Sequence, residues 1–73
     1  MNEQNPEQQP PEIDDAIRAV MLARAAAINS GILARLATVA DDLKAGLNRT
    51  ALGGLDGIEH ELAILRSVLL LLS

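Results

Sequence analysis

Residues 55–72, LDGIEHELAILRSVLLLL, are the stretch that determines the fold of this chain. Aliphatic side chains recur there at alternating steps of three and four residues, the spacing of an α-helical face and of a heptad seam. The seam positions are Leu55, Ile58, Leu62, Leu65, Leu69 and Leu72. More aliphatic residues lie outside the seam in residues 68–72, so the last two turns are apolar almost all round. Such a helix is expected to need neighbours on at least two sides.

An aliphatic stripe with helical spacing also runs through the preceding part of the chain. From Ile17 onward its steps are four, four and three residues, repeated, and their mean is close to that of a straight helix. Val20, Leu22, Leu33 and Ala40 lie beside the stripe and widen it, which predicts more than one packing partner. The stripe residues expected to pack in a core or interface are Ile17, Met21, Ile28, Ile32, Leu36, Val39 and Leu43.

Within the first helical segment, the run of helix-favouring residues is interrupted by Asn29, Ser30 and Gly31, three residues that are common in turns. They could form a turn that splits the segment into two helices, or a kink. We favour a continuous helix, because Ile28 and Ile32 stay in phase across the interruption. A glycine inside a helix costs only about 1 kcal/mol relative to alanine.

The helix ends are marked by capping residues. Negative charges that follow Pro11 predict a first helix that begins near Pro11 or Glu12. Gly46 is a candidate left-handed C-cap for that helix. The second helix is expected to begin at Thr50, a competent N-cap, although Asp56 with Glu59 offers a later capping box.

The composition excludes several classes of function. The chain has 73 residues, no cysteine and no aromatic residue, so it has neither disulfides nor thiolate metal sites, and it lacks aromatic platforms for nucleic-acid bases. Its formal net charge of −4 repels a phosphate backbone and an anionic membrane surface. We therefore predict no nucleic-acid partner, and membrane binding is not favoured.

The N-terminal residues carry no structural signal of their own. Residues 1–11 are rich in Gln, Asn, Glu and Pro, which predicts a disordered polar tail. They contain no basic segment followed by an apolar run, so no export signal is expected, and the run over residues 68–72 is too short to span a bilayer. A cytoplasmic location is the prediction.

Catalytic and cofactor chemistry is not expected. His60 is the only histidine, with Asp56 one helical turn before it, but two such groups do not hold a metal ion. The glycine-rich residues 52–57 follow no strand and lack the lysine of a phosphate-binding loop, so they are interpreted as a flexible helix start. We predict no enzyme activity, no cofactor and no metal.

The pattern as a whole predicts an all-α helical hairpin over residues 12–73, with a long first helix and a shorter second helix, that assembles into an oligomeric helical bundle. A lone hairpin of this kind would expose more apolar area than monomers usually tolerate, so a homodimer is favoured. The predicted function is a non-enzymatic interaction module that acts as a scaffold, assembly factor or small regulator. The alternative is an adaptor or chaperone whose Leu-rich C-terminal helix binds a helix of another protein.

Overall fold

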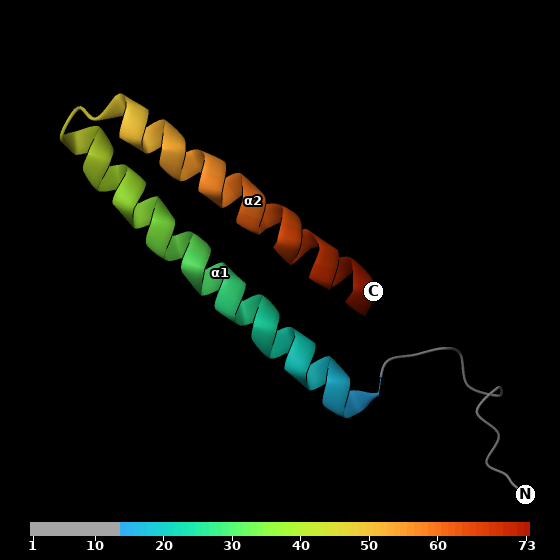
Figure 1. Cartoon of the computed structure of the whole chain (residues 1–73). Helices are drawn as coiled ribbons and strands as arrows, with labels where there is room; N and C mark the ends of the chain where they lie inside the picture. The colour runs from blue at the N-terminus through green and yellow to red at the C-terminus, as the bar shows by residue number, and fades with distance from the viewer. Residues whose placement is uncertain (1–13) are drawn as a thin grey trace, which may run out of the picture.

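The computed structural model describes residues 14–73, which form two antiparallel helices joined by a short turn (Figure 1). Helix α1 spans Asp15–Lys44 and α2 spans Asn48–Leu72, with 30 and 25 residues. The prediction of an all-α hairpin with a long first helix and a shorter second helix is confirmed. The predicted disordered tail, residues 1–11, lies outside the described residues.

Helix α1 begins at Asp15 because Asp14 caps it. The Asp14 backbone has non-helical angles, and its carboxylate accepts a hydrogen bond from the backbone N–H of Ala16 at 2.8 Å. This bond satisfies one of the four donors that a helix start leaves without an intrahelical partner. The predicted start near Pro11 or Glu12 is therefore too early.

Helix α1 continues without a break through Asn29, Ser30 and Gly31, as favoured from the phase of the flanking isoleucines. A side chain at Gly31 would meet no atom within 4 Å. This glycine therefore answers no packing requirement in the hairpin.

The turn between the helices is a Schellman motif. Gly46 has a φ of 76°, the left-handed conformation that glycine adopts without steric cost, which confirms its predicted role as a C-cap. The Leu47 N–H donates to the Asp42 carbonyl at 2.8 Å, and the Gly46 N–H donates to the Leu43 carbonyl at 3.1 Å.

The start of α2 at Asn48 corrects the sequence-based expectation. Its N-cap residue is Leu47, which has no side-chain capping bond, so neither Thr50 nor Asp56 caps the helix. The physical reason is the tight turn: the Leu47 carbonyl already accepts the N–H of Ala51 at 3.0 Å. The glycines at 53, 54 and 57 consequently lie inside α2.

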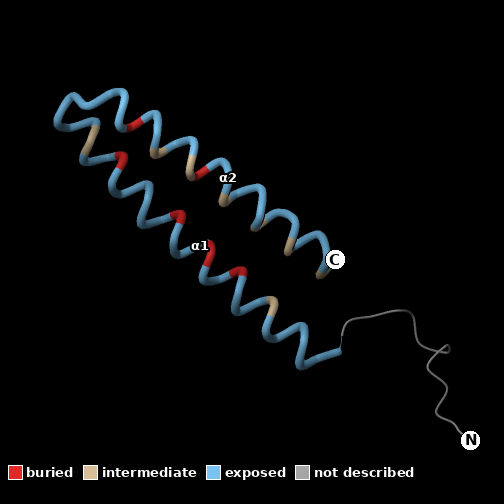
Figure 2. Tube along the Cα trace, viewed as in Figure 1, coloured by how far each residue is buried: buried red, intermediate tan, exposed pale blue. Residues whose placement is uncertain are grey.

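The hairpin core is narrow. Among residues 14–73, six side chains are buried, and none of these six residues is polar (Figure 2). Leu65 and Val68 pack against this core from α2. Within residues 14–73, one hydrogen bond joins the two helices, from Arg18 Nη1 to the Leu72 carbonyl at 3.0 Å. The buried residues are Ala25, Ile28, Ile32, Val39, Ala51 and Ile58.

The Arg18–Leu72 bond also shows how far α2 reaches along α1. The C-terminal end of α2 lies level with Arg18, so only about one turn of α1 extends beyond it (Figure 1). This uncovered end of α1 is too short to need a second subunit, so the apolar residues left to cover lie on the sides of the hairpin.

Two glycines let the helices approach closely. A Cβ at Gly54 would lie 2.8 Å from Cγ2 of Val39, and one at Gly57 would lie 2.9 Å from Nη1 of Arg35. The Val39 side chain is β-branched and stiff, so it cannot swing away easily. The guanidinium of Arg35 ends a flexible side chain and can move. Gly54 is therefore the tightest glycine contact in the hairpin.

The close contact at Gly54 predicts that substitution by alanine changes the stability of the fold in opposite directions at Gly53 and at Gly54. Gly53→Ala should stabilise the fold by about 0.4–1 kcal/mol, because Gly53 lies in α2 with nothing within 4 Å of its added Cβ. Gly54→Ala gains the same helix propensity but forces Val39 to shift, an overpacking cost of about 1–3 kcal/mol. Urea unfolding of both variants at equal concentration measures the difference. Equal stability of the two would contradict the close approach.

Candidate interaction surface

The hairpin divides the thirteen predicted packing residues into three groups. It buries Ile28, Ile32, Val39 and Ile58. It half-buries Met21, Leu65 and Leu72. It leaves the remaining residues exposed, namely Ile17, Leu36, Leu43, Leu55, Leu62 and Leu69.

The heptad seam of α2 is split lengthwise by this arrangement. Ile58 is buried and Leu65 packs against the core, so this line of the seam faces α1. The other line consists of Leu55, Leu62 and Leu69, which are 40%, 47% and 45% exposed. Residues seven apart are two turns apart and point in nearly the same direction. These leucines therefore form a straight row beside the core.

Helix α1 carries a second seam, which was not predicted from the sequence as a separate row of residues. Its positions alternate by four and three residues, as in a heptad pattern. The leucines among them are between 43% and 62% exposed. The signal was present in the sequence but was interleaved with the stronger stripe. The seam consists of Leu22, Ala26, Asn29, Leu33, Leu36, Ala40 and Leu43.

Both exposed rows lie on the same side of the hairpin. At 100° per residue, the α1 seam is rotated about 80° from the buried residues of α1. The α2 row is rotated about 40° from the line of Ala51, Ile58 and Leu65 on α2, in the same rotational sense along the chain. Because the two helices run in opposite directions, rows that are rotated in the same sense from the contact line, each viewed from the N-terminus of its own helix, lie on the same side of the hairpin. Gly57 and Arg35, which are rotated the other way, contact each other on the opposite side. We call the surface formed by the α1 seam and the α2 row the leucine face.

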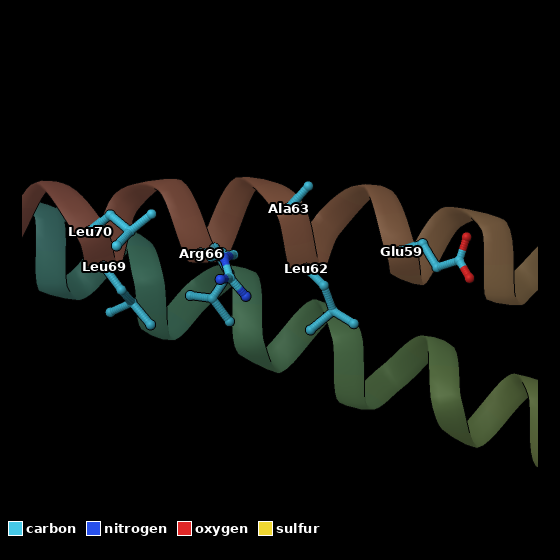
Figure 3. Close-up of a pocket in the computed structure, with 7 residues that line it drawn as sticks. Glu59, Leu62, Ala63, Arg66, Leu69 and Leu70 are labelled. Carbon is cyan, nitrogen blue, oxygen red and sulfur yellow. The ribbon is translucent and has the colours of Figure 1, made fainter.

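An open groove of about 580 Å³ lies on the α2 part of this face (Figure 3). In the close-up, Leu62 and Leu69 point toward α1, whereas Ala63 points away from it. Glu59 and Arg66 are the charged residues of the groove. Its complete lining is Glu59, Leu62, Ala63, Leu65, Arg66, Leu69 and Leu70.

The residues considered for acid–base or metal chemistry do not gather into a site in the described part of the chain. His60 and Asp56 are both exposed. Among residues 14–73, no group of three His, Asp or Glu side chains is placed to hold a metal ion. The absence of enzyme activity stays a prediction.

Helix α1 is long and apolar enough, by length and composition alone, to cross a membrane, a test that core helices of soluble proteins also pass. Only 17% of its most apolar window is buried inside the hairpin, so this helix has apolar surface to cover. Arg24 and Arg35 lie in its central part. Each would cost about 2.5–3.5 kcal/mol at the centre of a bilayer.

No family model, curated protein or solved structure matches the chain.

Proposed function

We propose that this chain is a non-enzymatic protein–protein interaction module that self-associates through the leucine face into a dimeric four-helix bundle. Such a bundle would act as a scaffold, an assembly factor or a small regulator. The observation that carries the proposal is the continuous row of half-exposed leucines along one side of both helices. A hairpin with one apolar side is half of a four-helix bundle.

The apolar area of the face is sufficient for association. Full burial of a leucine side chain contributes about 1.5–3 kcal/mol, so covering a half-exposed leucine contributes about 1 kcal/mol. In a dimer each copy would cover the leucine face of the other. The covered leucines of both copies would together stabilise the dimer by on the order of 10 kcal/mol or more. Association costs about 4–15 kcal/mol of rigid-body freedom, so a dimer at micromolar concentration is within reach.

A self-complementary surface also suits the charge distribution of the hairpin. The side opposite the leucine face carries Arg24 and Arg35, with Asp42 half-buried nearby. Arg24 and Arg35 make that side the more charged of the two, although Ile17 and Val20 are also exposed there, whereas the leucine face holds few charges. The leucine face is therefore the better side for a second copy to cover.

The groove on α2 supports a second candidate, an adaptor that binds a helix of another protein. A groove lined mainly by leucines fits the apolar side of an amphipathic helix. In that case the purified chain would remain a monomer with a dye-binding apolar surface until its partner is supplied. The state of the purified chain in solution therefore distinguishes the two functions.

The homodimer predicts a mass of about twice the 7.7 kDa of one chain in sedimentation or light scattering at micromolar concentration without detergent. Leu62→Glu should shift the protein to monomers, because it places a charge at the centre of the covered face. Leu71→Glu is the matched control, since Leu71 is 67% exposed on the far side of α2 and should leave the mass unchanged.

Three results would contradict the proposal. A folded monomer at these concentrations would favour the adaptor. A chain that is soluble only in detergent or lipid would favour membrane insertion of α1. Equal effects of the two glutamates would show that the leucine face is not the contact surface.

A further inference from the structure

The leucine face contains a few polar residues at defined positions. Asn29 is the single polar residue within the α1 seam and lies at the middle of α1. On α2, Glu59 and Arg66 flank Leu62 at the outer margin of the face and are exposed. A polar residue in an apolar seam reduces the stability of association and commonly fixes its register. These residues can therefore reveal which arrangement of two copies the face fits.

Contacts between the helices define which residues lie at the same height. Val39 lies beside Gly54, Arg35 beside Gly57, and Arg18 beside Leu72. Counting six residues along each helix from the Arg35–Gly57 contact places Asn29 level with Ala63. Because Glu59 and Arg66 are seven residues apart on α2, the midpoint between them lies at Leu62 and Ala63. The polar residue of α1 is thus level with the midpoint of the charged pair of α2.

We propose that the partner on the leucine face is a second copy related by a two-fold axis that runs perpendicular to the helices at the height of Asn29. This inference rests on the proposed self-association and specifies its geometry. In this arrangement α1 packs antiparallel on the partner's α1, and α2 packs antiparallel on the partner's α2. The two turns lie at opposite ends of the bundle.

The axis gives every polar residue of the face a partner. Glu59 lies opposite the partner's Arg66, and symmetry repeats this pair, so four charges are matched around the centre of the α2 contact. Asn29 lies opposite the partner's Asn29, where two amides can donate and accept hydrogen bonds.

The same axis matches charges at the ends of α1. Lys44, in the last turn of α1, is about level with the partner's Asp14 and Asp15 at the start of α1. This places a cation near a helix C-terminus beside an anion near a helix N-terminus, so each charge also interacts favourably with its own helix dipole.

The apolar residues also fit this register. Leu33 is about level with the partner's Ala26, a large residue against a small one, and symmetry repeats the pair. Leu62 lies close to the partner's Leu62 at the axis. Alternation of large and small side chains across a contact lets two helices interdigitate. The central part of the α1 seam, residues 22–36, is therefore self-complementary when reversed about Asn29, whereas Leu43 is level with the partner's Asp15.

The competing two-fold arrangement has its axis parallel to the helices. It would place α1 on the partner's α2 at equal height, with Glu59 against the partner's Leu33 and Arg66 against the partner's Ala26. Each charge would then lose water without gaining a partner, which is costly. The perpendicular axis avoids this cost.

Charge reversal tests the proposed pairs. Glu59→Arg and Arg66→Glu are prepared as two separate chains, each with like charges at both positions. Each alone should dimerise at least about tenfold more weakly than the unmodified chain, because symmetry brings the like charges together. Mixed, they should form a heterodimer with an affinity within about threefold of the original, since two opposite-charge pairs form. Sedimentation of the single and mixed samples measures this.

Asp56→Arg and Arg49→Glu are the matched controls. They make the same changes of charge on α2, but both positions point away from the core and from the leucine face. Each should dimerise like the unmodified chain, and their mixture should show no preference for heterodimers. Loss of affinity in the controls, or a mixture of the Glu59 and Arg66 variants that stays monomeric, would overturn the proposed pairing.

The direction of the partner is tested by a distance. The chain has no cysteine, so Ala45→Cys accepts a single spin label at the turn. Ala45 is about sixteen residues from the axis, so at about 1.5 Å per residue the two labels of a dimer should be about 48 Å apart.

An axis parallel to the helices would bring the turns together at less than about 20 Å. That distance in a stable dimer would refute the orientation while leaving the bundle intact. A monomeric unmodified chain would instead refute the proposed self-association itself.

Discussion

The structure depends on a contact between two helices that is close but narrow. The chain has no aromatic residues, and its aliphatic side chains fill little space between the helices. The two helices approach closely where the Val39 side chain packs against Gly54. The buried set is confined to isoleucine, valine and alanine. A core of this width covers one stripe on each helix. The remaining aliphatic residues stay on the sides of the hairpin, and the stability of a chain this small depends on what covers them.

The position of the glycines decides which leucines remain outside. Because Gly54 and Gly57 lie against α1, the line of contact on α2 runs through Ala51, Ile58 and Leu65. The row of Leu55, Leu62 and Leu69 is rotated about 40° from this line. If α1 lay on that row instead, leucines would separate the helices and the glycine contacts would be lost. Small residues thus direct the hairpin contact and leave the larger ones exposed.

The sequence predicted the helices better than it predicted their surfaces. Periodicity gave both helices and the continuity through Asn29–Gly31, and the special conformation of glycine identified Gly46 as the C-cap. The start of α2 was missed because a Schellman turn can lead directly into a helix without a side-chain cap, as it does at Leu47. Such closure depends on backbone geometry that residue preferences do not encode.

The division of the seams could not be read from spacing alone. The heptad pattern of α2 predicts that six aliphatic residues lie on one broad side of the helix, but it does not predict which three of them face α1. That choice depends on the partner helix, whose own two stripes overlap along the sequence. Only the contacts of Gly54 and Gly57 distinguish the stripe that is buried from the one that is left exposed. Likewise, spacing alone does not show that Asn29 lies in the exposed seam of α1, because this also depends on which stripe of α1 is buried.

The polar residues of the leucine face restrict what can occupy it. A lipid surface offers no matched partners to Asn29, Glu59 and Arg66, and burying them unpaired would offset much of what the leucines contribute. A helix of another protein could satisfy them only with its own polar residues at the corresponding heights. A second copy of this chain already carries the complementary set, and the midpoint of its α1 and the midpoint of its charged pair lie at one height. That coincidence is the reason to favour self-association over a face made for an unrelated partner.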